Sequence, residues 1–457
     1  MTRQATYSPT LSAEIFIIPL GEGSFVIYAP LEKSAFIGDA SAVNVLKHIQ
    51  LNDWNPLTPK DQSFLELLRR LSIVDGNKKE APNDQKDGDP LPTEITLFLS
   101  TACNLRCSYC YANAGETPLE FMDWSIAERG INFIIKNARL TKAKDITLSY
   151  HGGGEPTLNW KVLTRAWEYA TQKASQNQLT LNSFVATNGV LTRFKAEWIA
   201  KHLNGASVSF DGLPIIQNAQ RPLASGRGSF KQLDSTLRIF DHSSFKYQLR
   251  LTVTPELLPN LQKSIRFICD NYNAETIHIE PVYHEGRGKE TPHVEIEQFI
   301  NAYIDAEALA STKKRRVIFS AARLGVLTNH FCGVSRDSFG LTARGNVSAC
   351  YEAFNEKSEY ASKLIYGSFS DEEAVGFEFN LDKLDRLRHR TVNNIEYCEG
   401  CFAKWSCAGD CYVKQLEYAN HRSPEEPARC RITRELTLHQ IVQKIQDSGG
   451  IFWHEPC

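Results

Sequence analysis

The chain has 457 residues and a formal net charge of −2. This length predicts about two to four domains, and the near-neutral charge argues against a protein that binds nucleic acid. No apolar run is long enough to span a bilayer, and the first residues lack the pattern of a secretion signal. We therefore expect a cytoplasmic protein with no nucleic-acid partner and no membrane partner. In that compartment, twelve cysteines favour metal ligation or redox chemistry over disulfides.

The first part of the chain predicts a small unit that precedes a linker. Its expected elements are a β-hairpin and two helices, at residues 14–20, 25–31, 39–50 and 59–73. The hairpin is expected because Gly21-Glu22-Gly23-Ser24 separates the two apolar runs. After this unit the sequence becomes polar, charged and rich in Pro and Gly. We expect a domain over residues 1–76 and a linker over residues 77–92.

From residue 93 the pattern changes to strands that alternate with helices. The expected strands are 94–99, 145–150, 181–186, 206–210, 249–253 and 276–282. The expected helices are 124–138, 158–176, 192–203, 228–240 and 258–271. Repeated units of this kind predict an α/β fold, a partial (β/α)6 TIM barrel over residues 93–318. Ligands of such folds bind at the carboxyl ends of the strands.

Three cysteines follow the first barrel strand directly. They are Cys103, Cys107 and Cys110, in a Cys-x3-Cys-x2-Cys pattern. Three thiolates on one loop can hold three irons of a [4Fe–4S] cluster and leave the fourth iron open. A zinc site is the alternative, but it would need a fourth ligand nearby, and His151 is remote in sequence. The pattern therefore favours a reactive iron–sulfur site.

The cysteine loop resembles that of the radical S-adenosylmethionine (SAM) superfamily, and the resemblance continues along the barrel. Further segments that carry it are His151-Gly152-Gly153-Gly154-Glu155-Pro156, Thr187-Asn188-Gly189, Ser209-Phe210-Asp211-Gly212, Arg221-Pro222, Gly228-Ser229-Phe230 and Glu280-Pro281-Val282. The resemblance implies that the three cysteines hold a cluster whose open iron binds SAM. Reductive cleavage of SAM would then yield a 5′-deoxyadenosyl radical.

The same resemblance implies a set of cofactor-binding residues at the strand ends. These are Tyr111, Gly153, Gly154, Glu155, Pro156, Thr187, Asn188, Ser209, Asp211, Arg250 and Thr252. The glycines would allow the backbone to approach the cofactor closely. Arg250 and Thr252 resemble positions that contact the SAM carboxylate or ribose, although they could also be ordinary strand residues.

Seven further cysteines lie in the last third of the chain. They are Cys332, Cys350, Cys398, Cys401, Cys407, Cys411 and Cys430. Their spacing resembles the SPASM extension of radical SAM enzymes, which implies an iron–sulfur domain over residues 319–457. A zinc ribbon would explain only Cys398 and Cys401.

The SPASM resemblance implies two auxiliary [4Fe–4S] clusters, and thus three clusters in all. One would be held by Cys398, Cys401, Cys407 and Cys430, and the other by Cys332, Cys350 and Cys411. The second set lacks a fourth cysteine, so this cluster would have an open iron or a remote ligand. Cys269 and Cys457 are the candidates, although Cys269 lies on an apolar helix face and is expected in the core.

A SPASM extension implies a peptide substrate. The N-terminal unit resembles a winged-helix-like recognition domain that pairs a leader peptide with a sheet edge; the alternative is a structural cap. We expect a maturase that forms a cross-link within a precursor peptide, either a cyclophane carbon–carbon bond or a thioether. Its expected partners are that precursor, with its leader segment, and an external reductant such as flavodoxin or ferredoxin.

Three other functions stay open. Sulfatase maturases resemble the chain but carry an aspartate after the second cysteine of the extension, whereas Tyr351 and Glu352 follow Cys350 here. The chain could also act on a small molecule, or it could be a non-catalytic electron carrier. A carrier has no need of a SAM pocket, so the Gly-Gly-Glu-Pro segment argues against it. The candidates for a catalytic base are Tyr351, Glu352 and Asp337.

Overall fold

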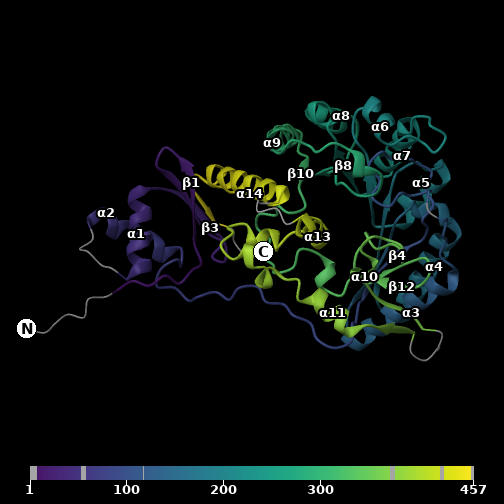
Figure 1. Cartoon of the computed structure of the whole chain (residues 1–457), viewed down its shortest axis with the longest axis horizontal. Helices are drawn as coiled ribbons and strands as arrows, with labels where there is room; N and C mark the ends of the chain where they lie inside the picture. The colour runs from purple at the N-terminus through teal and green to yellow at the C-terminus, as the bar shows by residue number, and fades with distance from the viewer. Residues whose placement is uncertain (1–7, 53–57, 117, 371–375, 422–426, 454–457) are drawn as a thin grey trace, which may run out of the picture.

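The structure is a computed structural model that describes residues 8–52, 58–116, 118–370, 376–421 and 427–453. Figure 1 shows a small N-terminal sheet at one end, a large sheet with its helices at the other, and C-terminal helices between them. Among the described residues, no helix is both long and apolar enough to cross a membrane.

The N-terminal unit is a four-stranded sheet with two helices. Its elements are β1 (Phe16–Gly21), β2 (Ser24–Ala29), β3 (Ser34–Asp39), α1 (Ala40–Leu51) and α2 (Pro59–Arg70). The hairpin and both helices predicted from the sequence are confirmed, while β3 was missed. The sheet order is β1-β2-β3-β15, and β15 (Ile451–Trp453) comes from the far end of the described chain.

Both faces of the N-terminal sheet are covered. Successive side chains of a strand point to opposite faces, so Ile27 packs on the helix side with Leu46 and Leu68. Val26, on the other face, packs against Ile441 of α14 (Ala428–Asp447). The unit is therefore built into the molecule through the C-terminal helix.

The large sheet contains the six predicted barrel strands, which are confirmed. In spatial order its strands are β10 (Arg316–Ile318), β9 (Thr276–Pro281), β8 (Tyr247–Val253), β7 (Gly205–Ser209), β6 (Thr180–Thr187), β5 (Asp145–His151), β4 (Glu94–Phe98), β11 (Gly340–Leu341), β12 (Asn346–Ser348), β13 (Ile365–Phe369) and β14 (Phe377–Phe379). β4 to β10 are parallel neighbours. β10 was not predicted, because its three residues give too short a pattern.

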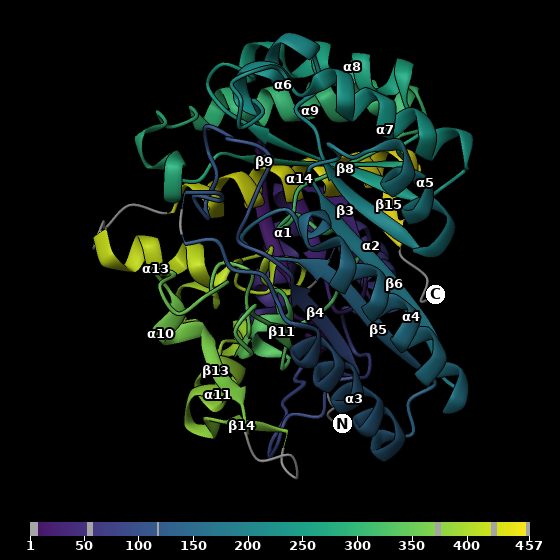
Figure 2. The same ribbon diagram turned by 90° about the vertical axis from the view of Figure 1, so that its right-hand side faces the viewer.

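The C-terminal third extends this sheet beyond β4. β11 pairs with β4 in parallel, and β12 to β14 continue in antiparallel register. The result is one continuous mixed sheet (Figure 2). The cysteine-rich segment is therefore hydrogen-bonded to the first barrel strand.

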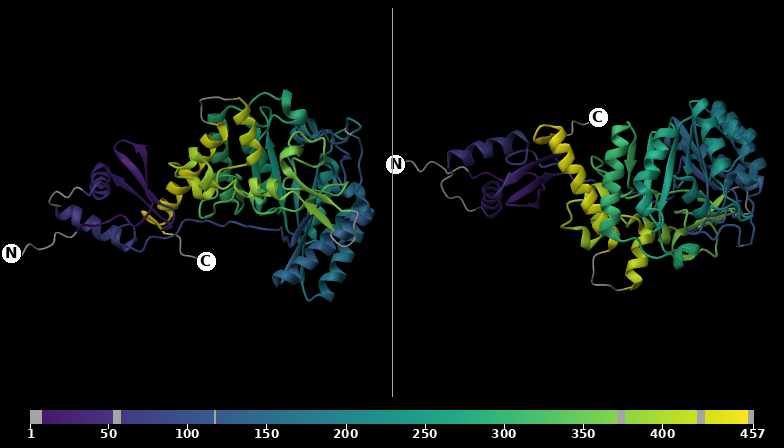
Figure 3. Two further views of the ribbon diagram at one scale, coloured as in Figure 1. Left: turned by 60° about the horizontal axis from the view of Figure 1, so that its bottom comes forward. Right: turned by 90° about the horizontal axis from the view of Figure 1, so that it is seen from above.

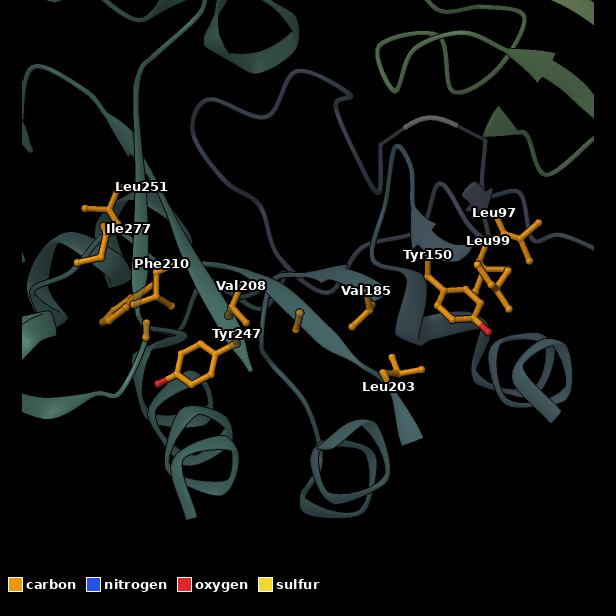
Figure 4. Close-up of a cluster of buried hydrophobic side chains, with 14 of the residues drawn as sticks. Leu97, Leu99, Tyr150, Val185, Leu203, Val208, Phe210, Tyr247, Leu251 and Ile277 are labelled. Carbon is orange, nitrogen blue, oxygen red and sulfur yellow. The ribbon is translucent and has the colours of Figure 1, made fainter. Parts of the chain in front are cut away.

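Helices cover the outer face of the parallel strands. They are α3 (Trp124–Thr141), α4 (Trp160–Gln176), α5 (Arg193–His202), α6 (Pro214–Gln220), α7 (Phe230–His242), α8 (Leu261–Asn271) and α9 (Ile296–Thr312). Shorter helices of the last third are α10 (Ala361–Leu364), α11 (Leu381–Arg388), α12 (Lys404–Cys407) and α13 (Tyr412–His421). Figure 4 shows strand side chains such as Leu97, Val185 and Leu251 in the core beneath these helices.

The segment expected to be a linker is pinned to the C-terminal third. No helix or strand occurs between residues 77 and 93. The Asp84 carbonyl accepts from His330 Nε2 at 2.7 Å, and the Gly88 carbonyl accepts from Arg388 Nη1 at 2.8 Å. Figure 3 shows this segment as a long blue trace from the N-terminal unit to the barrel. These hydrogen bonds tie it to the cysteine-rich region along its path.

Leu46→Ala tests whether the N-terminal unit has its own core. Leu46 is 1% exposed, so the truncation should cost about 2–5 kcal/mol of unfolding free energy. Hydrogen exchange of the β2 amides measures this loss. Leu51→Ala is the control, because Leu51 is 75% exposed and its truncation should leave exchange unchanged. Equal effects of the two variants would contradict a separate core.

Candidate active site

The Cys103–Cys110 loop leaves the carboxyl end of β4 and is held by hydrogen bonds to the end of α6 and to the segment that follows β9. Ser108 N donates to Gln220 O at 2.9 Å. Arg287 N donates to Cys110 O at 3.0 Å, and Arg287 Nε donates to Cys107 O at 2.8 Å. The loop is therefore fixed at the end of the barrel where ligands of such folds bind.

A buried carboxylate joins the ends of β5 and β6. Glu155 is 2% exposed and accepts from Thr157 N at 3.1 Å and Thr157 Oγ1 at 2.7 Å. It also accepts from Thr187 Oγ1 at 2.9 Å and Asn188 N at 2.8 Å. Asn188 Nδ2 in turn donates to Asn104 Oδ1 at 2.7 Å, inside the cysteine loop. Burial raises the pKa of Glu155, and these hydrogen bonds oppose the shift.

A second buried carboxylate fixes the other side of the loop. Asp211 is fully buried and accepts from the Tyr109 hydroxyl at 2.5 Å and from Gln220 Nε2 at 2.8 Å. Arg221 Nε donates to it at 2.9 Å, and Thr252 N donates at 3.2 Å. Burial raises the pKa of Tyr109 well above its usual value. The hydrogen bonds of Asp211 therefore go to the protein, and the residue acts by positioning the loop.

Two glycines of the predicted SAM segment lie against other parts of the site. A Cβ on Gly154 would lie 2.2 Å from the Ala102 carbonyl oxygen, in the cysteine loop. A Cβ on Gly153 would lie 2.4 Å from the Phe354 ring. A side chain cannot be accommodated at such distances, so glycine at these positions permits the close approach. Pro156, which follows Glu155, is buried and begins a short 3-10 helix.

The remaining predicted cofactor residues line the inside of the barrel. Arg250 is exposed, and its neighbours Leu249 and Leu251 are buried under the helices, so Arg250 points into the barrel. Ser209, at the end of β7, is half-buried. The Tyr111 hydroxyl donates to Gly152 O at 3.1 Å. An arginine here can pair with a carboxylate.

A cavity of about 730 Å³ runs inside the barrel below these residues. At one end lie His151 and Tyr351, whose rings stack with centroids 4.1 Å apart at an angle of 18°. Phe184 also lines it and is 42% exposed. Burial lowers the pKa of His151 to about 4, so its ring is neutral at pH 7. The cavity thus has a largely neutral aromatic end.

The seven C-terminal thiols fall into two groups. Burial raises the pKa of Cys407, and charge on Asp410, Cys430, Cys401 and Cys398 acts in the same direction. Burial likewise raises the pKa of Cys350, and Glu352, Cys411 and Cys332 add to the shift. Such mutual effects require the thiols of each group to be near one another.

The spacing of these thiols bears on the kind of metal they could hold. In the part of the chain that the structure describes, no three His, Cys, Asp or Glu side chains are grouped to bind one metal ion. A zinc ion would draw four ligand atoms to about 2.3 Å from one centre. An iron–sulfur cluster is likewise held by cysteine thiolates, and a [4Fe–4S] cluster takes four of them.

Sequence reasoning missed a layer of buried charges beside these thiols. Lys414 Nζ lies 2.6 Å from Glu285 Oε1 and 3.9 Å from Glu352 Oε1. Burial raises the pKa of Glu352 to about 8, with Lys414 opposing the shift and Glu285 adding to it. A cavity of about 270 Å³, lined by Tyr111, Glu285 and Glu352 among others, leads to this layer. No sequence motif marks Glu285 or Lys414, because they meet only in the fold.

Other expected residues lie apart from this layer. Both oxygens of Asp337 accept from Arg388, at 2.8 and 3.0 Å, which indicates a structural role. Cys269 lies on α8, where Arg315, Asp270 and Lys313 influence its thiol. Cys457 lies outside the described residues.

Asp211→Asn tests the loop-positioning role. The substitution leaves buried Arg221 without its charged partner, so we expect a loss of about 3–5 kcal/mol of unfolding free energy. Chemical denaturation measures the loss, and hydrogen exchange at Cys107–Cys110 should rise. The control is Glu197→Gln, which removes an exposed pair with Arg193 and should change neither quantity. Unchanged hydrogen exchange at Cys107–Cys110 in Asp211→Asn would contradict the role of Asp211 in positioning the loop.

Glu352→Gln tests the pKa of the buried carboxyl. A carboxyl whose pKa is raised on folding holds its proton more tightly in the folded chain, so stability falls as pH rises from about 4.5 toward 8. The variant lacks this titration. In denaturant melts of metal-free protein from pH 5 to 8.5, the intact chain should lose more stability than the variant. If the unfolding free energies of the two chains changed with pH in the same way, the pKa of Glu352 would not be raised by folding.

Comparisons with known proteins agree with this geometry. Residues 97–268 match the family model of the radical SAM superfamily. Over 165 residues the chain is 28% identical to the sporulation killing factor maturation protein SkfB of Bacillus subtilis, covering 36% of each chain. Over 220 residues it is 23% identical to a serine-type anaerobic sulfatase-maturating enzyme of Klebsiella pneumoniae, covering 47% of this chain and 54% of that one.

A solved structure shares the fold. Native anSMEcpe with bound AdoMet and Kp18Cys peptide aligns with a TM-score of 0.61 at 17% identity, over 78% of this chain and 99% of that one. The chain spans 57%, 46% and 36% of the lengths of the first curated relatives that it matches. With this match and the cysteine loop at the end of the first barrel strand, residues 97–268 of the chain form a radical SAM domain.

Proposed function

We propose that the chain is a radical SAM maturase that forms an oxidative cross-link within a precursor peptide, either a cyclophane carbon–carbon bond or a thioether. The observation that carries the proposal is the presence of three groups of thiols around one barrel. One group follows β4, and two lie in the segment that extends the same sheet. A cross-link removes two hydrogens from the peptide, so an enzyme that makes it needs both a radical initiator and an electron acceptor.

The first group would hold the SAM-binding [4Fe–4S] cluster through Cys103, Cys107 and Cys110. When bound, that cluster supplies the electron that cleaves SAM to the 5′-deoxyadenosyl radical. Arg250 would pair with the SAM carboxylate from inside the barrel, since it is exposed there. Tyr111, Gly153, Ser209 and the remaining strand-end residues would shape the pocket, with Glu155 and Asp211 acting through the loop that they hold.

The other thiols would hold two auxiliary [4Fe–4S] clusters. Cys398, Cys401, Cys407 and Cys430 would form one set, and Cys332, Cys350 and Cys411 the other. The position of Cys269 on α8 argues against it as a fourth ligand of the second set. An external reductant such as flavodoxin or ferredoxin would supply electrons to the enzyme.

Glu352 is the strongest of the three candidates for the group that accepts the substrate proton. It lines the 270 Å³ cavity that also reaches Tyr111, and Lys414 lies close enough to balance its charge. Asp337 is engaged by Arg388, and the Tyr351 ring is stacked on His151. A base must reach the proton that it takes, and of the three candidates only Glu352 lines this cavity. It would take the proton in its ionised form, which Lys414 stabilises.

Formylglycine formation on a sulfatase is the second candidate. It is favoured by the similarity to anaerobic sulfatase-maturating enzymes. Against it stands Tyr351 at the position that follows Cys350. Mass spectrometry of a reacted peptide separates the two, because a cross-link changes the fragmentation pattern between two residues and formylglycine changes one residue.

The test of the proposal is iron content and SAM cleavage after anaerobic reconstitution. We expect about twelve irons per chain and 5′-deoxyadenosine on addition of SAM and reductant, as three four-iron clusters require. The variant with Cys103, Cys107 and Cys110 changed to Ala should lose about four irons and all deoxyadenosine. Cys269→Ala is the matched control and should keep both. Zinc in place of iron, or no SAM cleavage by the intact chain, would refute the proposal.

A further inference from the structure

An aromatic seam fills the space between α4 and α5 on the outside of the barrel (Figure 2). The ring centroid of Trp160 lies 5.2 Å from that of Trp198 and 6.2 Å from that of Phe194. Trp167 lies 5.6 Å from Trp198, on which His202 stacks at 4.4 Å. Phe194 is 65% exposed. The seam therefore presents apolar surface to solvent at the start of α5.

The same two helices are basic. Together α4 and α5 carry six Lys or Arg residues and two Glu residues, while the whole chain has a net charge of −2. The basic residues are Lys161, Arg165, Lys173, Arg193, Lys195 and Lys201, and the acidic ones are Glu168 and Glu197. In contrast, α9 of the same barrel carries three acidic residues and no Lys or Arg. Clustered charge of one sign attracts a partner of the opposite sign, so the side formed by α4 and α5 suits an acidic protein.

Hydrogen bonds join this side of the barrel to the cysteine loop. Lys195 Nζ donates to Thr157 O at 2.6 Å. The Glu155 carboxylate accepts from Thr157 N at 3.1 Å and from Asn188 N at 2.8 Å. Asn188 Nδ2 in turn lies 3.7 Å from Cys103 Sγ. A short series of packed side chains therefore leads from α5 to a thiol of the first group.

We propose that the α4–α5 face, formed by Lys161, Phe194, Trp198 and Lys201, is the docking surface for a small acidic electron-carrier protein. That this carrier is the external reductant rests on the proposed function. Protein interfaces favour aromatic residues with charges around them, and the interfaces of electron-transfer partners are small. In the docked complex one electron leaves the reduced carrier and passes to the cluster held by the cysteine loop. The carrier is thereby oxidised by one electron.

The place of the face favours an electron donor over a substrate. The parallel strands, β5 and β6 among them, lie between the outer helices and the barrel interior, into which Arg250 points. A peptide bound outside these strands could not reach SAM inside the barrel. An electron can cross the same layer, because it passes through packed side chains without an open path.

The first test compares a protein reductant with a small one on anaerobically reconstituted chains. Lys161→Glu/Lys201→Glu reverses two exposed charges of the face, and Lys263→Glu/Arg266→Glu is the matched control on α8. With limiting reduced flavodoxin at low salt, formation of 5′-deoxyadenosine should slow about tenfold or more in the first variant, because charge steering raises association rates by about 10–10³-fold. It should stay unchanged in the control. With dithionite, which needs no docking surface, all three chains should react alike.

The second test detects the contact without catalysis. Carbodiimide joins Lys ammonium groups to the carboxylates of a bound acidic protein. With oxidised flavodoxin and the reconstituted chain, mass spectrometry should find cross-links at Lys161 or Lys201 and none at Lys263. Phe194→Ala should weaken flavodoxin binding about fivefold or more in titration calorimetry, as the loss of an aromatic anchor does. Leu51→Ala, which truncates an exposed side chain of the N-terminal unit, should leave binding unchanged.

The proposal is wrong if Lys161→Glu/Lys201→Glu and the intact chain react equally fast with flavodoxin, or if cross-links form only outside α4 and α5. It is also wrong if dithionite supports SAM cleavage while neither flavodoxin nor a ferredoxin does. A dimer of the intact chain that Lys161→Glu/Lys201→Glu abolishes would mean that a second copy covers the face.

The two tests separate this inference from the proposed function. Cross-links on the face without SAM cleavage by any reductant would refute only the proposed function. SAM cleavage with dithionite, together with flavodoxin-driven rates that ignore the charge of the face, would refute only the docking surface.

Discussion

The site depends on two buried carboxylates at the ends of barrel strands. Glu155 and Asp211 are almost fully removed from water, and a buried carboxylate is costly unless hydrogen bonds or a cation compensate it. The charge of Glu155 is compensated by hydrogen bonds from Thr187 and Asn188 at the end of β6. The charge of Asp211 is compensated by Arg221 and by a hydrogen bond from the cysteine loop. Both interactions hold the same loop, so three thiols stay together without any secondary structure of their own.

A layer of paired charges lies beside the C-terminal thiols. Arg429 bridges Asp410 and Glu280, and Lys414 lies between Glu285 and Glu352. Each of these two cations has two carboxylate neighbours. Burial raises the pKa of Asp410 to about 7 and that of Glu352 to about 8. This layer can therefore hold a proton near neutral pH.

The sequence predicted the barrel because alternating strand and helix patterns are local. It also placed the cysteine loop at a strand end, since both lie in one short segment. β15 could not be predicted to join β3, because that pairing links residues more than 400 positions apart. Glu285 and Lys414 belong to different elements with no shared motif. Asp211 was predicted among the cofactor-binding residues from a motif. The structure adds its hydrogen bonds to Tyr109, Gln220 and Arg221, which a motif alone does not reveal.

The helix α14 gives the molecule a fixed internal length. It begins beside Cys430 and ends where the chain turns into β15 on the N-terminal sheet. Its 20 residues span about 30 Å at 1.5 Å per residue. Ile441 and Ile445, in its second half, pack on the N-terminal sheet, while Cys430 lies in its first turn. One rigid element therefore fixes how far the N-terminal sheet lies from the cysteine-rich region.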